Sequence, residues 1–435
     1  MEFHAVICCG KGVNLNPLSK VKETGIAKAL LPIGNKPMIE YVLEWCDQGQ
    51  FREITVVTDS ESNEDIGKVV ESYSIKTRTE NSQLSTIKMN IFDGDSTGEI
   101  LELFENDPSE FILLPCDFIT DLPPQVLIEQ YRNRESDDIA MTVHYLNQFE
   151  SIDKKSLTHY YTVYSEDCHL LDIHSKDSVE LSKALELRAQ MVWRYPISKV
   201  STKLLDSFIY FISNDALQII KRELPDYRLK SATKILRDLG RRSWKHSDQK
   251  NGISLFVLPN ECSFVRSDNI PAYMEANRYI MKLRAKAQQQ PPQAKEKGAA
   301  TVGADSVVGE NTLLGERTSV KKTVVGKNCK VGKRCRLTGC VLLDNITLED
   351  DVVLENCIIG QNAIIHNKAR LTNCNIEGSY TVAKGSQIKG ETLTNLFIEG
   401  ESASDSEDSE DNSDGYDSYE DDFEDDFEDD GLFER

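Results

Sequence analysis

Short apolar runs alternate with amphipathic stretches along the first 284 residues of the chain. Apolar runs bounded by turn residues predict strands at residues 5–9, 54–58, 111–114, 139–144, 208–213 and 253–258. Apolar residues at helical spacing predict helices at residues 125–132 and 231–239, and after Pro37 and Pro271. The helix after Pro37 is expected to end just before Gly49. Because strands and helices alternate, we expect an α/β domain with a mainly parallel, covered sheet.

A different pattern begins at Val308, where apolar β-forming residues recur in steps of six, six and five. The positions are Val308, Leu314, Val320, Val325, Val331, Leu337, Leu342, Leu348, Leu354, Ile359, Ile365, Leu371 and Ile376. Three steps make 17 residues, which predicts a coil with three short sides and inward-pointing residues that stack between coils. Glycines often follow the recurring residue, at positions 309, 315, 326, 332 and 360. We expect them where a corner approaches closely or adopts a positive φ.

Two polar segments flank these repeats. Residues 285–300 contain a proline pair and no apolar periodicity, which predicts a linker. Residues 401–435 contain 18 acidic residues and one arginine, and so contribute −17 to the net charge of −22. We expect residues 396–435 to form a disordered tail, because little apolar surface is available to offset the entropy of ordering.

Aromatic residues interleave with the acidic residues of this tail, with Phe423 and Phe427 four positions apart. Solubility is the simplest role for such a tail, but solubility requires no aromatic side chains. We therefore expect the tail to engage a basic partner surface. Acidic residues follow three serines, which are candidate phosphorylation sites: Ser404, Ser406 and Ser409. So acidic a chain argues against direct binding of nucleic acid.

Eleven cysteines are scattered along the chain, mostly in apolar stretches and without a CxxC pair. This usage indicates a reducing compartment and not a disulfide scaffold or a zinc module. Residues 168–174 hold four potential metal ligands, but their apolar positions alternate as in a strand, and we favour the strand. Neither a signal sequence nor a transmembrane run is visible, so we expect a cytosolic protein without a membrane partner.

The first predicted strand leads into a glycine-rich turn, Gly10-Lys11-Gly12. A tight turn needs glycine whether or not it binds phosphate. The longer pattern resembles the loop of sugar-phosphate nucleotidyltransferases, roughly Ala-Ala-Gly-x-Gly-Thr-Arg-Leu-x-Pro-Leu-Thr followed by Pro-Lys-Pro-Leu-Leu-Pro. The residues in register are Leu15, Pro17, Leu18, Lys28, Leu30, Leu31, Pro32, Gly34, Lys36 and Pro37. The resemblance implies a Rossmann-like domain and makes Gly10, Lys11, Gly12, Asn14 and Lys28 nucleotide-binding candidates.

The departures from this pattern fall where the chemistry should be. Asn14 replaces the arginine of the family, Val13 its threonine, and Ala27 the proline before Lys28. A guanidinium can clamp the charge that develops on the phosphates, whereas an uncharged amide cannot. Because loss of one such donor typically costs ~10²- to 10³-fold in rate, we expect a degenerate site without catalytic residues.

A second fragment tests the same resemblance. Asp117 follows the predicted strand 111–114, where the related enzymes hold magnesium, but Cys116 replaces the glycine before it. Magnesium prefers oxygen ligands and needs more than one carboxylate. Asp268 is a loose match for the second, although an aspartate before a helix is also a natural cap. Asp117 and Asp268 are thus candidate relics of a metal site, and we expect no metal or other cofactor.

The 17-residue coils resemble the left-handed parallel β-helix of hexapeptide-repeat proteins, and only this resemblance implies the handedness. Some hexapeptide acyltransferases use a histidine in this fold. His366 is the only histidine of the repeats, but a lone histidine at a corner is more simply explained as facing solvent.

A nucleotidyltransferase-type α/β domain (1–284), a linker (285–300), a β-helix (301–395) and a tail (396–435) resemble two families. One is the nucleotide-sugar pyrophosphorylases. The other comprises the gamma and epsilon types of subunit in the guanine-nucleotide exchange factor for eukaryotic translation initiation factor 2. The eroded site favours the second family, and the short segment after the β-helix favours its gamma type, because epsilon adds a helical-repeat exchange domain.

This resemblance implies a non-catalytic subunit. It would pair with epsilon, join the alpha, beta and delta subunits, and help to dock initiation factor 2. The alternatives are an active sugar-phosphate nucleotidyltransferase and another kind of scaffold.

Overall fold

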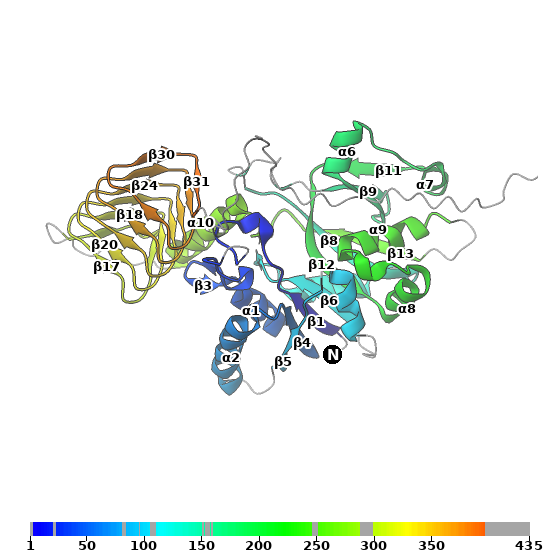
Figure 1. The fold of residues 1–435 in the computed structure, drawn as a ribbon. Coiled ribbons are helices and arrows are strands. Elements are labelled where there is room, and N and C mark those ends of the chain that lie inside the picture. The colour runs from blue at the N-terminus through cyan, green and yellow to red at the C-terminus, as the bar shows by residue number, and fades with distance from the viewer. Residues whose placement is uncertain are drawn as a thin grey trace, which may run out of the picture.

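The computed structural model describes residues 3–20, 23–80, 84–94, 96–104, 110–149, 152, 157, 160–245, 251–287 and 299–395. The expected tail, its three candidate phosphorylation sites Ser404, Ser406 and Ser409, and most of the expected linker lie outside these residues. Figure 1 shows an α/β domain beside a stack of short strands, with α10 (Ile270–Ala287) between them.

Seven strands form the central sheet of the α/β domain. They are β1 (Phe3–Cys8), β4 (Glu53–Thr58), β5 (Ile87–Ile91), β6 (Glu110–Pro115), β8 (Asp138–Leu146), β12 (Leu204–Ile212) and β13 (Gly252–Val257). Their order is β13-β8-β12-β6-β1-β4-β5. All neighbouring pairs are parallel except the two that include β12, so the prediction of a mainly parallel sheet is confirmed.

Helices cover both faces of this sheet. One layer contains α1 (Met38–Gly49), α2 (Asn63–Glu80) and α4 (Pro124–Arg132), and the other contains α3 (Thr97–Ile100), α8 (Asn214–Glu223) and α9 (Ala232–Arg242). Along β1, Ala5 and Ile7 pack toward the first layer and Val6 toward the second, as strand geometry requires. The helices predicted at residues 125–132 and 231–239 are confirmed.

The helix after Pro37 ends slightly later than expected. Gly49 is the last residue of α1, and Gln50 closes the helix with a φ of 51°. A Cβ on Gly49 would lie 2.7 Å from the ring of Phe51. Glycine is therefore required there for space and not for a left-handed conformation.

Two small sheets complete the α/β domain. β7 (Phe118–Thr120) pairs with β14 (Phe264–Arg266), and β9 (Tyr160–Ser165), β10 (Leu170–Ser175) and β11 (Ser198–Ser201) form a sheet in the order β10-β9-β11. Helices α6 (Lys176–Ser182) and α7 (Ala189–Arg194) lie in the connection from β10 to β11. The strand interpretation of residues 168–174 is confirmed, and Asp172 there pairs with Arg241 and His174.

From Thr301 onward, three parallel sheets wind into a β-helix. The first holds β15 (Thr301–Val302), β18 (Ser319–Lys321), β21 (Arg336–Thr338), β24 (Val353–Glu355), β27 (Arg370–Thr372) and β30 (Gln387–Lys389). The second holds β16 (Val307–Val308), β19 (Val324–Val325), β22 (Val341–Leu342), β25 (Ile358–Ile359), β28 (Asn375–Ile376) and β31 (Thr392–Leu393). The third holds β17 (Leu313–Leu314), β20 (Lys330–Val331), β23 (Thr347–Leu348), β26 (Ile364–Ile365) and β29 (Thr381–Val382).

The predicted 17-residue register is confirmed. Val308 pairs with Val325, and Val325 pairs with Leu342 in the next coil. Eleven of the thirteen predicted inward positions are buried, and the other two, Val308 and Leu314 in the first coil, are half-buried. The stacked coils therefore share one apolar core, as the repeat requires.

The corners of the β-helix use glycine and asparagine differently. A Cβ on Gly326 would lie 2.5 Å from the carbonyl oxygen of Leu343 in the next coil. None of the five predicted corner glycines has a positive φ, so close approach explains them. Left-handed residues recur at other corners with the same rhythm, and several of them are asparagines: Asn311, Asn328, Asn345, Asn356, Asn362 and Asn373. Asparagine tolerates this conformation better than most residues.

One hydrophobic cluster joins the two domains. It combines the core of the β-helix with Ile33 and with four residues of α10: Tyr273, Met274, Ile280 and Met281. The Asn277 side chain accepts a hydrogen bond from the Gly34 amide (2.9 Å), and Asn35 Nδ2 donates to the Val325 carbonyl (2.8 Å). The loop at residues 32–37, with β2 (Pro32–Ile33) and β3 (Lys36–Pro37), thus links α10 to the β-helix.

Among the helices that the structure describes, each is too short or too polar to cross a bilayer.

Substitution of Gly326 by alanine should destabilise the chain by about 1–3 kcal/mol, because the new Cβ would press on backbone that cannot move freely. Gly67→Ala in α2 is the matched control, since nothing lies within 4 Å of that position. The control should gain about 0.5–1 kcal/mol from helix propensity. Urea unfolding measures both, and equal effects would contradict the close-approach explanation.

Candidate functional site

β1 leads into the glycine turn at the sheet edge where β4 and β6 also end. Gly12 has a φ of 75°, and a Cβ there would lie 3.0 Å from the Cβ of Lys28. Both its conformation and its surroundings therefore require glycine. Gly10, Lys11 and Asn14 are exposed, with Asn14 in a short 3-10 turn, η1 (Val13–Leu15).

Lys28, Asp117 and Arg266 form a buried ion cluster. Lys28 Nζ lies 2.6 Å from Asp117 Oδ2, and Arg266 Nε lies 3.4 Å from Asp117 Oδ1. The Asp117 side chain is fully buried, whereas Lys28 is 11% and Arg266 18% exposed. A buried carboxylate is stable only when it is paired. The two cations therefore hold Asp117 in place and occupy both of its oxygens.

The pKa shifts in this cluster agree with three charged groups. Burial alone raises the pKa of Asp117, but Lys28 and Arg266 outweigh it and bring the pKa below its ordinary value. Burial lowers the pKa of Lys28, and the attraction of Asp117 reverses this, so that the pKa is raised. At neutral pH the carboxylate and both cations are thus in their charged forms.

Three distant segments supply the cluster. Lys28 begins η2 (Lys28–Leu30), Asp117 lies between β6 and β7, and Arg266 ends β14. The carbonyl of Asp117 also accepts a hydrogen bond of 2.8 Å from the amide of Ser267. The ion cluster therefore fastens the loop after β1 to the strand pair β7 and β14.

Further acidic groups surround Arg266. Burial lowers the pKa of its guanidinium, but Asp117, Asp268 and Asp206 raise it above the ordinary value. A bulge in β12 gives Phe208 a φ of 59°, and the guanidinium carbon lies 5.3 Å from the centre of its ring. The structure thus brings the two predicted carboxylates, Asp117 and Asp268, to opposite partners of one arginine.

Asp268 is not the cap of the following helix. The side chain of Asn269 accepts the amide hydrogen of Ala272 (2.9 Å) at the start of α10. The sequence offered two roles for Asp268, and the capping role belongs to its neighbour.

The magnesium ion implied by the nucleotidyltransferase resemblance does not fit these residues. Both oxygens of Asp117 face cations, and its neighbour Cys116 offers sulfur, whereas magnesium prefers oxygen. Over the residues that the structure describes, no group of three or more His, Cys, Asp or Glu side chains could hold a metal ion.

Two cysteines lie beside the ion cluster, which the sequence analysis did not anticipate. Cys9 follows β1 and Cys116 follows β6, and the register of these strands places the two opposite each other. A hydrogen bond with Cys116 raises the pKa of Cys9. That hydrogen bond and the nearby Lys28 lower the pKa of Cys116, against the effect of burial. These thiols fill space next to the glycine turn and leave the carboxylate without a second oxygen donor.

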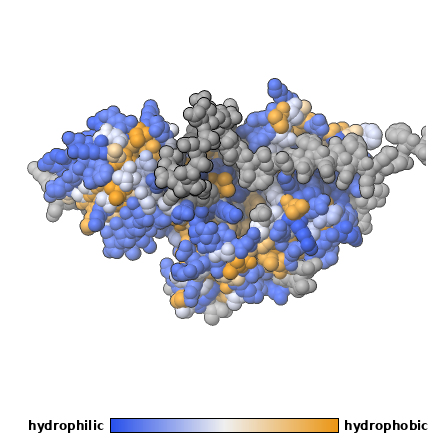
Figure 2. All heavy atoms as spheres, viewed as in Figure 1, coloured by the Kyte–Doolittle hydropathy of each residue, from blue (hydrophilic) through white to orange (hydrophobic). Residues whose placement is uncertain are grey.

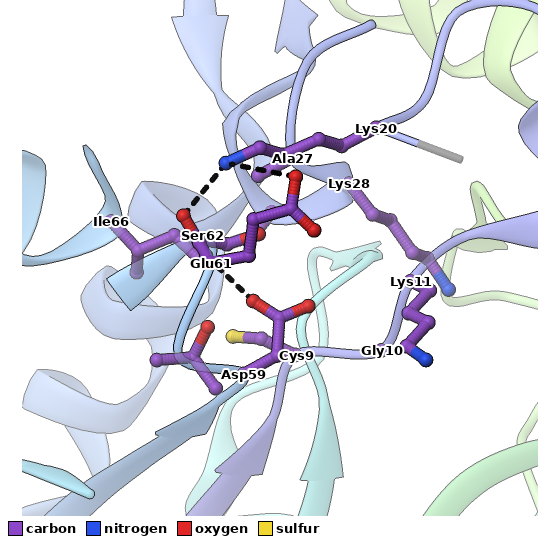
Figure 3. A pocket seen from close by; sticks show the side chains of 12 residues that line it. Cys9, Gly10, Lys11, Lys20, Ala27, Lys28, Asp59, Glu61, Ser62 and Ile66 are labelled. Atoms are coloured by element: carbon purple, nitrogen blue, oxygen red, sulfur yellow. Dashed lines mark hydrogen bonds and ion pairs between the residues drawn. The ribbon is translucent and has the colours of Figure 1, made fainter. Parts of the chain in front are cut away.

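A small pocket remains between the glycine turn and the loop after β4 (Figure 3). Its volume is about 40 Å³, whereas small-molecule pockets usually enclose ~300–1,000 Å³. Figure 3 shows Lys20 reaching Glu61, and the Lys20 ammonium donates to the Glu61 carbonyl (2.7 Å). Of the lysines that line the pocket, Lys20 and Lys28 are therefore held by groups of the chain itself, and Lys11 is exposed.

Substitution of Lys28 by methionine should destabilise the protein by about 3–5 kcal/mol, because Asp117 would lose its closest countercharge inside the protein. Lys20→Met is the matched control, since its partner Glu61 is largely exposed. The control should cost less than about 1 kcal/mol. Chemical denaturation of both variants tests this, and a mild effect of Lys28→Met would mean that the ion pair contributes little.

The contribution of Asp117 should depend on pH. Its pKa is lower in the folded than in the unfolded chain, so its stabilising effect is present above the unfolded value and is lost as the pH falls. The stability difference between the wild type and Asp117→Asn should be full at pH 7 and shrink below about pH 4. Unfolding curves from pH 3 to 7 measure it, and a constant difference would contradict a charged pair.

Comparisons with known proteins agree with this two-part architecture. The family model "Nucleotidyl transferase" matches residues 5–151, and the model "EIF2B subunit epsilon LbH domain" matches residues 289–388. The gamma subunit of translation initiation factor eIF2B from Schizosaccharomyces pombe is 28% identical over 313 residues, which cover 65% of this chain and 66% of that protein. The match thus spans slightly less than two thirds of the relative's length. The chain is therefore a homologue of an eIF2B gamma subunit, with a nucleotidyltransferase-like domain followed by an eIF2B-type β-helix.

Proposed function

We propose that this chain is a non-catalytic subunit of the guanine-nucleotide exchange factor that returns translation initiation factor 2 to its GTP-bound form. The observation that carries the proposal is the ion cluster. Lys28 and Arg266 occupy the carboxylate of Asp117 at the sheet edge where a nucleotidyltransferase would need it free. The domain retains its shape without this chemistry, and a retained shape is most simply explained by interfaces.

The β-helix supports the same proposal. The chain resembles a gamma subunit over most of its length, and its β-helix matches a model of the epsilon subunit. We infer that this chain pairs with the epsilon subunit, joins the alpha, beta and delta subunits, and helps to dock initiation factor 2. In this role it acts in the cytosol, without a cofactor of its own and without direct contact to nucleic acid or membrane.

An active sugar-phosphate nucleotidyltransferase is the second candidate. The nucleotidyl transferase model matches residues 5–151, and the glycine turn keeps the backbone form of a phosphate-binding loop. Binding of a nucleotide without turnover would agree with either candidate, and Lys11 is the exposed cation nearest to the turn. Release of pyrophosphate would distinguish the two.

Gentle affinity capture of the tagged chain from its own cells tests the proposed assembly. We expect four different companion chains and initiation factor 2 to elute with it as one large particle. Recovery of the chain alone or as a homo-oligomer would overturn the proposal and redirect attention to Lys28 and Asp117 as parts of an enzyme.

Asn14→Arg alone should not produce nucleotidyl transfer. The new guanidinium would restore one clamp, but Asp117 would still be bound by two cations, and Cys116 would still offer no oxygen. Pyrophosphate release from a nucleoside triphosphate and a sugar phosphate, with magnesium present, is the measurement. Turnover by the variant would show that Asn14 was the one missing element, and turnover by the wild type would favour the enzyme.

A further inference from the structure

The small sheet of the α/β domain carries an apolar surface far from the ion cluster. We define the docking surface as five exposed side chains on or next to α7 and β11: Leu187, Val192, Trp193, Ile197 and Val200. Trp193 is 75% and Ile197 57% exposed. Figure 2 shows hydrophobic residues at the surface of this end of the molecule, over α6 and α7. Contiguous exposed apolar patches are unusual on a protein that has no partner for them.

The backbone of this region is also available for pairing. β11 is an edge strand, and among the described strands β9 is its one neighbour. An edge strand presents unpaired amide and carbonyl groups on its outer side. An extended peptide can add to such an edge while neighbouring pockets or patches receive its side chains.

The charge of the docking surface has one sign. Residues 187–205 include four cations and no acidic residue, and the cations are Arg188, Arg194, Lys199 and Lys203. Arg188, Lys199 and Lys203 are exposed. The surface therefore suits a segment that combines acidic and aromatic residues, because each side chain type has a matching partner on it.

We propose that residues 416–435 of this same chain dock on this surface. They contain eleven acidic residues and one arginine, and their aromatic residues are Tyr416, Tyr419, Phe423, Phe427 and Phe433. Without residues 401–435, the net charge of the chain would be −22 + 17 = −5, so this segment holds most of its negative charge.

The segment is long enough to reach the surface. The described chain ends at Asn395, and the 28 residues from there to Phe423 can span up to ~95 Å when extended. A compact protein of this length has a radius of gyration of ~22 Å. Tethering places the segment at an effective millimolar concentration near the surface, so even modest contacts produce docking.

Docking of this kind has two components. Phe423 and Phe427 cover Trp193 and Ile197, while the acidic residues between them approach Lys199 and Lys203. Exposed ion pairs weaken as salt rises, so the docked state depends on ionic strength. Phosphate on Ser404, Ser406 or Ser409 adds negative charge on the same segment and strengthens the attraction.

Acrylamide quenching of tryptophan emission in the full-length chain tests the proposal. The other tryptophans, Trp45 and Trp244, are only 5% and 4% exposed, so quenchable emission reports on Trp193. We expect Phe423→Ser with Phe427→Ser to raise the quenching constant severalfold at low salt. The difference from the wild type should disappear near 0.5 M salt, where screening shortens the range of the charges to a few Å.

The controls separate the docking surface from general effects. Lys199→Glu with Lys203→Glu should raise quenching as the tail substitutions do, whereas Leu229→Ser, at an 80% exposed site on another loop, should not. The tail substitutions change no described residue, so they test the proposal even if the double lysine variant unfolds.

Equal quenching in the wild type and the tail variant would overturn the proposal. A tail-dependent protection that grows with protein concentration would also overturn it, because the occupant would then be the tail of a second copy. Protection that does not depend on protein concentration is the expected result.

Discussion

A carboxylate without solvent contact must be paired, and Asp117 is the clearest case in this protein. Its side chain is fully buried at the end of β6, and Lys28 and Arg266 provide the two countercharges. Desolvation of an ion costs several kcal/mol unless such partners are present. The requirement to pair Asp117 therefore fixes the positions of the loop that carries Lys28 and of the strand that ends in Arg266.

The same requirement extends to the second domain. Arg266 lies four residues before α10, and α10 packs against the core of the β-helix and against the loop at residues 32–37. The ion cluster and the junction between the domains are thus connected through one short segment of chain. A domain held in this way presents a constant surface to its neighbours. This agrees with the proposal that the chain contributes shape and contacts to a larger assembly, whereas turnover would require the carboxylate to be released.

Much of this fold could be predicted from local patterns. The period of 17 residues specified the β-helix because each coil repeats the same short-range constraint, and the strands of the α/β domain followed from runs of apolar residues. The motif also located Lys28 and Asp117, and its departures at Asn14 and Cys116 indicated the loss of chemistry. Arg266 was not predicted, because it lies 149 residues from Asp117 and its role depends on a tertiary contact. The bulge at Phe208 and the contact of Cys9 with Cys116 were missed for the same reason. The asparagine corners had a visible signal in the recurrence of Asn311, Asn328, Asn345 and Asn362, which the apolar positions alone did not include.

The most direct test of this account replaces the ion cluster by apolar side chains. Lys28→Met, Asp117→Leu and Arg266→Met together remove every charge of the cluster, and such replacement of a buried ionic group is often neutral or stabilising. The measurement is the rate of GDP release from initiation factor 2, catalysed by the assembled exchange factor with this triple variant or with the wild-type chain. The account predicts that the variant assembles and that the two rates agree within about twofold, because the cluster only holds the structure together. A variant that folds and assembles but slows GDP release tenfold or more would contradict it, because the charged groups would then take part in the activity.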